Sequence, residues 1–358
     1  MEQLRTRPRI ADVAREAGVS KTAVSFAFNS PERLSQDTAM RIHGIADALG
    51  YRPHPVARML SQRRTRTLGI LTPQALSVVF ANPFFATFSE GVAAAAEEAG
   101  YGLLFVSPVY GSLARAVGRA TVDGFVAIGL SEEHPEVGQI RRADLPIVLV
   151  DSAAFSEHAA VDVDDEGGAR QAAEHLLALG HRDILVVGIE PPTPGAHTDF
   201  GGVMGRRLAG YRAALLNAGV ELPDNHVVVG PASIDGGAAC LTRAWEDGLR
   251  PTAVLAMSDV MAIGAISAAG RLGLAVPADL SVVGFDDIEM ACHVAPPLTT
   301  VHQPTRRKGE EACRLLLAAI ERRDGARPEH RLLETRLIVR ASTGPAPQRG
   351  RELVEDTD

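Results

Sequence analysis

A short stretch near the amino terminus carries side chains that can hydrogen-bond to the bases of DNA. Lys21, Thr22, Ser25 and Phe26 fall on one side of a helix predicted over residues 21–28. A lysine ammonium group can donate to guanine, and a threonine can bond to a base edge or contact the methyl group of thymine. This combination of residue types predicts an element that contacts the major groove of DNA.

The spacing around this stretch predicts two short helices joined by a tight turn. Apolar residues recur every three or four positions from Ile10 to Ala17, so one face of the first helix can pack against a neighbour. Gly18 ends this helix because glycine readily takes the left-handed conformation, and Ser20 is an N-cap for the second helix. The pattern is that of a helix-turn-helix motif, with an ordinary helical hairpin as the alternative.

A third helix, predicted to end at Gly50, completes an all-α headpiece over residues 1–52. A linker over residues 53–67 follows, and its prolines permit a short helix over residues 55–61. The apolar side of this helix is too small for it to be stable alone, so we expect it to fold only on a partner. The arginines that close the linker fit either a solvated tether or contacts with phosphates.

The formal net charge of −8 is unevenly distributed along the chain. Residues 1–67 hold 12 Lys and Arg against 6 Asp and Glu, a net charge of +6, and the remainder holds 24 against 38, a net charge of −14. A basic segment is attracted to a phosphate backbone and an acidic one is repelled by it. We therefore expect only the amino-terminal part to bind DNA.

Length and composition exclude several classes of protein. The chain has 358 residues, of which 46% are hydrophobic and 22% charged, as is typical of a globular protein of more than one domain. No apolar run approaches the ~18 residues of a membrane span, and no secretory signal precedes the headpiece, so we expect a cytoplasmic protein without a membrane partner. The three cysteines are widely spaced, so we expect no disulfide, no metal site and no cofactor.

Beyond residue 67, short apolar runs alternate with helical stretches that end in Ala-Gly or Leu-Gly. Repeated strand, helix and glycine predicts parallel sheets covered by helices. About eight such units exceed one ordinary open sheet, so we expect an α/β core of two doubly wound lobes with a cleft between them. The predicted strands are 68–71, 103–106, 125–128, 147–150, 184–187, 227–229, 254–257 and 282–285.

Polar and aromatic residues follow several of these strands, where ligands bind in open α/β folds. They are Phe84, Phe85, Asp151, Ser258, Asp259, Asp286 and Asp287. Taken singly, each is better explained as a helix N-cap or a solvated loop end, but together they predict a ligand in the cleft. The chain has no glycine-rich phosphate loop and no Gly-x-Ser-x-Gly or His-Glu-x-x-His motif, so we do not expect an enzyme.

A series of motifs follows along the chain in a fixed order. They include Ile10-Ala-Asp-Val-Ala, Gly18-Val-Ser, Gly50-Tyr-Arg-Pro, Asn82-Pro-Phe-Phe, Glu174-His-Leu-Leu-Ala-Leu-Gly-His181, Arg207-x-x-Gly210-Tyr, Ser258-Asp-x-Met-Ala-Ile-Gly264 and Pro297-Leu-Thr-Thr-Val-His-Gln303. In this order they resemble the lactose-repressor and galactose-repressor (LacI/GalR) family of transcriptional regulators. The resemblance covers nearly the whole chain, from Ile10 to Gly344.

The resemblance implies a homodimer that binds operator DNA, with a helix-turn-helix headpiece on a periplasmic-binding-protein-like core. The expected domains are the headpiece (1–52), the hinge helix and linker (53–67), the core (68–344) and a disordered tail (345–358). The expected lobes are an N-lobe (68–163 and 295–326) and a C-lobe (164–294 and 327–344). In the family, a small molecule between the lobes changes the lobe angle and hence the affinity for operator DNA.

The resemblance also implies roles for residues of the headpiece and hinge. The implied base readers are Lys21, Thr22 and Phe26, and the implied phosphate contacts are Ser20, Ser25 and Asn29. Leu60 aligns with the hinge-helix leucine that wedges into the minor groove. Phe26 departs from the polar residue common at its position, and two roles are open for it: contact with a thymine methyl group, or cover for the headpiece core.

In the cleft, the implied effector contacts are Phe84, Phe85, Asp151, Arg207, Ser258 and Asp286. Carboxylates paired with a forked guanidinium group suit a polyhydroxylated ligand, because each sugar hydroxyl can both donate and accept. We therefore expect a sugar as the effector. The segment 193–203 departs from the family and leaves the identity of that effector open.

Alternatives remain for both the function and the effector. The chain could be a small-molecule-binding protein or an enzyme whose headpiece no longer reads DNA, and a regulator could respond to a purine or to a protein partner. We expect a repressor, and the sequence is compatible with a ligand that weakens or strengthens DNA binding.

Overall fold

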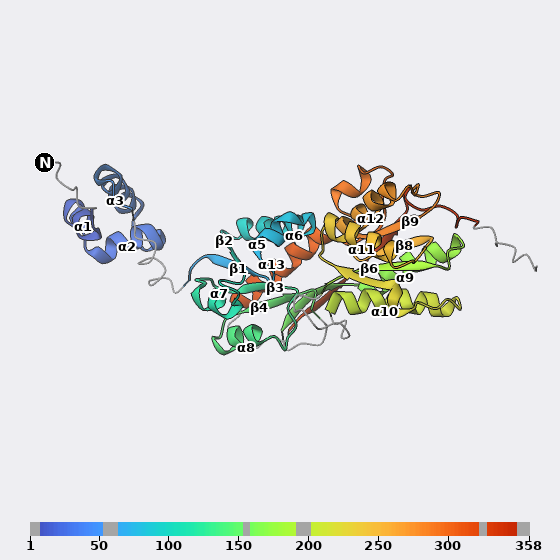
Figure 1. Cartoon of the computed structure of the whole chain (residues 1–358). Helices are drawn as coiled ribbons and strands as arrows, with labels where there is room; N and C mark the ends of the chain where they lie inside the picture. The colour runs from blue at the N-terminus through green and yellow to red at the C-terminus, as the bar shows by residue number, and fades with distance from the viewer. Residues whose placement is uncertain (1–7, 53–63, 153–157, 191–201, 322–327, 349–358) are drawn as a thin grey trace, which may run out of the picture. The chain divides into compact units, whose positions relative to one another are not determined.

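The computed structural model describes residues 8–52, 64–152, 158–190, 202–321 and 328–348. It divides into two compact units, one up to Arg66 and the other from Thr67 (Figure 1). The predicted hinge helix over residues 55–61 lies outside the described residues. None of the helices in the described ranges is both long and apolar enough to cross a lipid bilayer.

The first unit packs the helices α1 (Ile10–Ala17), α2 (Lys21–Asn29) and α3 (Gln36–Leu49) around one small core. As predicted, α1 and α3 end at glycines with positive φ, Gly18 at 63° and Gly50 at 68°. The buried core consists of Val13, Ala14, Ala17, Val24, Ala27, Ile42, Ala46 and Tyr51. The predicted helix-turn-helix headpiece is confirmed.

The second unit contains two six-stranded sheets within the described residues, which confirms the predicted α/β core of two lobes. The first sheet, in the order β11-β5-β4-β3-β1-β2, pairs only in parallel. Its strands are β1 (Thr67–Leu71), β2 (Gly102–Val106), β3 (Phe125–Ile128), β4 (Ile147–Val150), β5 (Ala159–Val163) and β11 (His330–Leu333). We call this sheet and its helices the first lobe.

The second sheet has the order β12-β10-β9-β8-β6-β7 and is parallel except for its edge strand β12. Its strands are β6 (Ile184–Ile189), β7 (Val227–Gly230), β8 (Ala253–Ala256), β9 (Ser281–Asp286), β10 (Thr299–His302) and β12 (Arg336–Ile338). We call this sheet and its helices the second lobe. In both lobes the parallel strands bring their carboxyl ends to one edge, where ligands bind in such sheets.

Helices cover both faces of each sheet (Figure 1). In the first lobe, α5 (Leu76–Ala81) leads into α6 (Pro83–Glu98), which shares one face with α13 (Thr305–Glu321), and α7 (Leu113–Arg119) and α8 (Pro135–Arg142) cover the other. In the second lobe, α9 (Asp165–Ala178) and α10 (Gly202–Asn217) lie on one face and α11 (Ile234–Glu246) and α12 (Asp259–Arg271) on the other.

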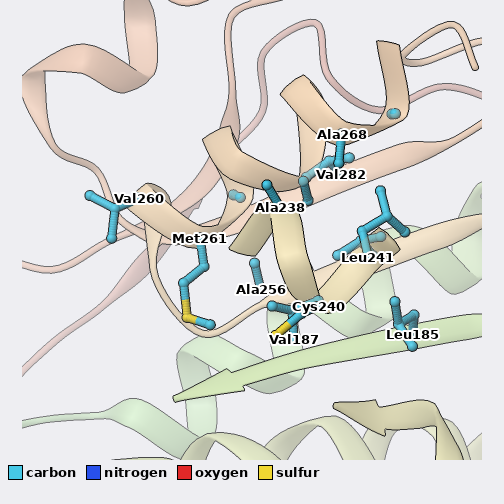
Figure 2. Close-up of a cluster of buried hydrophobic side chains, with 14 of the residues drawn as sticks. Leu185, Val187, Ala238, Cys240, Leu241, Ala256, Val260, Met261, Ala268 and Val282 are labelled. Carbon is cyan, nitrogen blue, oxygen red and sulfur yellow. The ribbon is translucent and has the colours of Figure 1, made fainter. Parts of the chain in front are cut away.

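Figure 2 shows the interface between the second sheet and the α11–α12 pair. Leu185 and Val187 of β6 lie against Cys240 and Leu241 of α11, with Met261 of α12 close by. All five side chains are buried, and the small residues of both helices let them approach the sheet closely. This packing fixes the position of the second sheet, whose strands carry polar residues at their carboxyl ends.

Two strands lie in the lobe opposite to the predicted one. Residues 295–326 were expected in the N-lobe and 327–344 in the C-lobe, but β10 pairs with β9 in the second sheet and β11 pairs with β5 in the first. The predicted lobe boundaries are therefore wrong at these strands. Backbone pairing at a sheet edge decides where a strand lies, and hydrophobic periodicity does not encode that pairing.

The carboxyl-terminal segment is bound to the core beyond the predicted start of the disordered tail. A disordered tail was expected from residue 345, but the backbone N–H of Ala346 donates to the carbonyl of Leu179 at 2.9 Å. This hydrogen bond fastens the segment to the end of α9. The remainder of the predicted tail, residues 349–358, lies outside the described residues.

Candidate functional site

A cavity of about 270 Å³ lies between the carboxyl ends of the strands of the two lobes. The six predicted effector contacts all line it: Phe84, Phe85, Asp151, Arg207, Ser258 and Asp286. Sequence reasoning missed further polar residues of the lining, which include Thr72, Gln74, Asn82, Glu190 and Gln303. The structure thus brings together residues from both lobes that are far apart in the sequence.

The start of α6 gives the cavity an aromatic wall. The side chain of Asn82 caps this helix by accepting a hydrogen bond from the backbone N–H of Phe84 at 3.1 Å. Pro83 occupies the first helical position, where its missing N–H costs nothing. The rings of Phe84 and Phe85 then lie edge to face with centroids 5.3 Å apart, so one ring face can stack on a ligand.

The two cavity carboxylates lie at strand ends with unusual backbone geometry. Asp151 follows β4 with φ 56°, and Asp286 ends β9 with φ 123°. Non-glycine residues rarely adopt positive φ, and such strain concentrates at functional sites. Burial raises the pKa of Asp286 to about 6, although attraction from Arg207 opposes this shift.

Arg207 enters the cavity from α10 and is held on several sides. Its Nε donates to Asp165 Oδ1 at 2.8 Å, Nη1 donates to the carbonyl of Met257, and the guanidinium group stacks 3.5 Å from the ring centroid of Phe285. Nη1 also lies 3.8 Å from Asp286 Oδ1. Burial lowers the pKa of Arg207, but Asp165 and Asp286 outweigh burial and raise it, so the group stays charged.

Lys308 of α13 is the most unexpected residue beside the cavity, because it is 0% exposed. Its Nζ donates to both carboxylate oxygens of Asp151, at 2.7 and 2.9 Å, and to Gln303 Oε1 at 2.7 Å. The amide of Gln303 in turn donates to Asp286 Oδ1 at 2.5 Å. A continuous polar chain, Asp151–Lys308–Gln303–Asp286, therefore joins the strand ends of the two lobes.

Sequence reasoning missed Lys308, although its spacing held a signal. In α13 it lies four and eight residues before the buried Ala312 and Leu316, so the helical period places it on the buried face. A buried lysine needs an acidic partner. The partner, Asp151, lies far away in the sequence and could not be assigned from it.

A second link between the lobes is made by Arg206, the neighbour of Arg207. Its Nη1 donates to the carbonyl of Ser152 in the first lobe at 3.2 Å, and its Nη2 donates to Asp165 Oδ2 at 2.8 Å. Asp165, at the start of α9, thus receives both arginines. One carboxylate therefore holds both guanidinium groups, Arg206 through Oδ2 and Arg207 through Oδ1.

The remaining strand-end residues have structural roles. Ser258 lines the cavity but also caps α12, accepting from the backbone N–H of Met261 at 3.4 Å. Asp259 accepts from Thr300 Oγ1 at 2.5 Å and from the backbone N–H of Ile288 at 2.8 Å, and burial raises its pKa. Asp287 is bound by Arg340 at 2.5 Å and lies within 3.0 Å of His302.

In the headpiece, the predicted DNA-contacting residues lie on and beside α2. Lys21 and Thr22 are exposed, and Ser20 caps the helix by accepting from the backbone N–H of Ala23 at 3.1 Å. Asn29 Nδ2 donates to Ser25 Oγ at 3.2 Å, one turn away. Leu60 lies outside the described residues.

A helix-turn-helix headpiece and a two-lobed core with a polar cavity define a class: regulators whose DNA binding responds to a small ligand. Comparison with known proteins gives the family. Residues 9–54 match the family described as bacterial regulatory proteins, lacI family, and residues 173–343 match the periplasmic binding protein-like domain.

Similar proteins extend over nearly the whole chain. The HTH-type transcriptional regulator CelR of Thermobifida fusca is 33% identical over 94% of this chain and 99% of its own length. The HTH-type transcriptional repressor PurR of Vibrio atlanticus (strain LGP32) is 34% identical over 88% of this chain and 92% of its own length. The chain therefore belongs to the lacI family and is a DNA-binding transcriptional regulator.

Solved structures agree with this assignment. A complex of a transcriptional regulator CelR with cellobiose shares 31% identity over 94% of this chain and 100% of that chain, with a TM-score of 0.70. The lac repressor dimer bound to operator and the anti-inducer ONPF shares 26% identity over 95% and 100%, with a TM-score of 0.80. The fold predicted from the sequence matches both.

Proposed function

We propose that the protein is a repressor whose affinity for operator DNA is set by a sugar bound in the cavity between the lobes. The observation that carries this proposal is the set of groups lining the cavity: the carboxylate of Asp286, the guanidinium group of Arg207 and the rings of Phe84 and Phe85. Acceptors and donors placed side by side suit neighbouring hydroxyls, and the aromatic wall suits a sugar ring. The solved CelR complex contains cellobiose.

The polar chain between the lobes supplies a mechanism for the response. A hydroxyl that donates to Asp286 competes with Gln303 for the same carboxylate, and Gln303 is bonded to Lys308 of the first lobe. Binding of the ligand thereby favours an arrangement of the lobes in which the Gln303–Asp286 hydrogen bond is broken over the arrangement in which it is intact. A coupling free energy of about 1–3 kcal/mol would change operator affinity roughly 5- to 150-fold.

On the DNA side, Lys21 and Thr22 are proposed to read bases, and Ser20, Ser25 and Asn29 to contact phosphates. The exposed positions of Lys21 and Thr22 at the amino-terminal end of α2 support this assignment, since recognition helices contact bases with that end. Leu60 is proposed to enter the minor groove from the hinge.

The proposed active form is a homodimer in the cytoplasm, where operator DNA is located. Exposed apolar side chains of the first lobe support a dimer surface: Val78 and Phe80 of α5 and Leu104 of the edge strand β2. The solved lac repressor is a dimer on its operator. The relatives are regulators, and we propose that this chain likewise has no enzymatic activity.

Two assays test the proposal. A thermal-shift screen of sugars, with nucleobases alongside them, identifies the ligand, and a gel shift with the DNA upstream of the gene measures operator binding. We expect a sugar that raises the melting temperature also to change operator affinity at least fivefold. A nucleobase that does both instead would overturn the sugar assignment, and the lack of any specific DNA complex would overturn the repressor.

The variant Arg207→Ala tests whether the ligand binds in the cavity, and Arg212→Ala is its matched control on the same helix. Arg212 is exposed and pairs with Asp224 at 3.3 Å, outside the cavity. We expect the first variant to lose the ligand response while retaining operator binding, and the second to behave as the parent protein. A full response in the Arg207 variant would place the ligand elsewhere.

A further inference from the structure

Phe26 lies on the face of α2 that points away from the headpiece core. Two positions along an α-helix turn through about 200°, so residues two positions from Val24 point away from it. Val24 is 0% exposed, and Thr22 and Phe26 are the residues at that distance on either side. Phe26 thus shares its face with the exposed Thr22, one helical turn away.

The packing of the headpiece leaves Phe26 outside its core. The partly buried residues that pack against the core are Ile10, Val19, Phe28, Leu34 and Ile45. Phe28 fills the aromatic place in this core, with its ring 4.7 Å from that of His43 and 5.9 Å from that of Tyr51. The guanidinium group of Arg33 covers Phe26 instead, 5.1 Å from the ring centroid.

A phenyl ring has no hydrogen-bond donor or acceptor, so it cannot recognise the polar edge of a base. The major groove offers one apolar group that distinguishes bases, the methyl group of thymine. A ring held against a guanidinium group keeps its position, and the charge beside it is attracted to phosphate.

We propose that Phe26 determines operator sequence by contact with a thymine methyl group in each half-site. The inference rests on the proposed DNA reading by α2, and it specifies one base that this helix requires. Thr22, on the same face, contacts the neighbouring base. The operator of this protein therefore contains a T·A pair in each half-site, with the thymine methyl group against the ring of Phe26.

The test begins with selection of operators from randomised duplex DNA by the full-length protein. Each thymine of the selected half-site is then replaced by 2′-deoxyuridine, which removes only the methyl group. At one thymine we expect a loss of affinity of about fourfold, and of about 15-fold when both half-sites carry the replacement. A selected operator bound equally well with uracil at every thymine overturns the proposal.

Variants assign the methyl contact to Phe26. Phe26→Ala should bind the thymine and uracil operators equally, whereas the control Lys21→Ala should bind more weakly but keep the fourfold preference at that thymine. Phe26→His should select a different base there. If Phe26→Ala keeps the preference, the contact belongs to another residue and the proposal is wrong.

The proposal and the repressor function fail in different ways. If the parent protein selects no DNA sequence, the function itself is wrong, whereas a selected operator without methyl dependence overturns the role of Phe26 alone. Circular dichroism checks that each variant is folded. The uracil experiment on the parent protein needs no variant, and a lack of methyl dependence there overturns the proposal even if Phe26→Ala does not fold.

Discussion

Asp286 is 7% exposed at the end of β9, and charged groups face it from several elements. Arg207 comes from α10, Lys308 from α13, Asp151 follows β4, and Asp259 begins α12. Burial raises the pKa of Asp286 to about 6, with Arg207, Gln303 and Lys308 opposing the shift and Asp151 adding to it. The carboxylate is therefore ionised near neutral pH and becomes protonated in mild acid.

The affinity for the effector should depend on this ionisation. Hydroxyls that donate to Asp286 favour its charged form, so we expect full affinity above about pH 7 and a decline, as pH falls through about 6, that approaches tenfold per pH unit. Calorimetric titration of the identified sugar between pH 5 and 8 measures the effect. Asp286→Asn should bind more weakly with a flat profile, and the same decline in this variant would contradict the role of Asp286.

Individual residues also show where sequence reasoning reaches its limit. Ser258 was predicted as a cavity residue and it is one, yet its hydroxyl also caps α12, which is the alternative that its position after a strand allows. The choice between the two roles for Phe26 needed the packing around it. Short-range patterns name candidates, and only packing shows which atoms remain free for a ligand.

Among the elements, α6 and α13 cross at two glycines that let their backbones touch. A Cβ atom on Gly309 would overlap the carbonyl oxygen of Phe88 and lie 2.9 Å from the backbone nitrogen of Val92. A Cβ atom on Gly91 would overlap the carbonyl oxygen of Arg306. Since α6 carries Phe84 and α13 carries Lys308, this crossing fixes the side chains beside the cavity.

Gly309→Ala should therefore destabilise the core, because the added methyl group meets backbone that cannot move alone. We expect a loss of about 1–3 kcal/mol in the free energy of unfolding, measured by denaturant titration. The matched control is Gly270→Ala in α12, where an added Cβ atom meets nothing within 4 Å and should stabilise by about 0.5–1 kcal/mol. Equal effects at both sites would contradict the close crossing.

At the scale of the whole molecule, the two lobes are joined through polar side chains as well as through the chain itself. Lys308 binds Asp151 and Gln303, and Gln303 binds Asp286, so one buried ammonium group connects the carboxyl edges of the two sheets. Arg206 makes a separate link to the carbonyl of Ser152. A ligand that binds between the lobes must either break these hydrogen bonds or bind with them in place.

Lys308→Met should remove the first link and reduce the ligand response. Asp151 would remain buried without its cation, so we expect a stability loss of about 3–5 kcal/mol. The double variant Asp151→Asn/Lys308→Met should recover part of that stability but not the response, measured as the ratio of operator affinities without and with ligand. An unchanged ratio in the double variant would show that the link does not transmit the signal.

The sequence by itself determined the local elements and their order: the headpiece, the alternation of strands and helices, and the strand-end residues around the cavity. These follow from short-range physics, because caps, turns and hydrophobic periods act within a few residues. Only the tertiary structure decided that β10 belongs to the second lobe and β11 to the first. It also decided that Lys308 is the partner of Asp151 and that Phe26 faces away from the core. These depend on contacts between residues far apart in the chain, which no local pattern specifies.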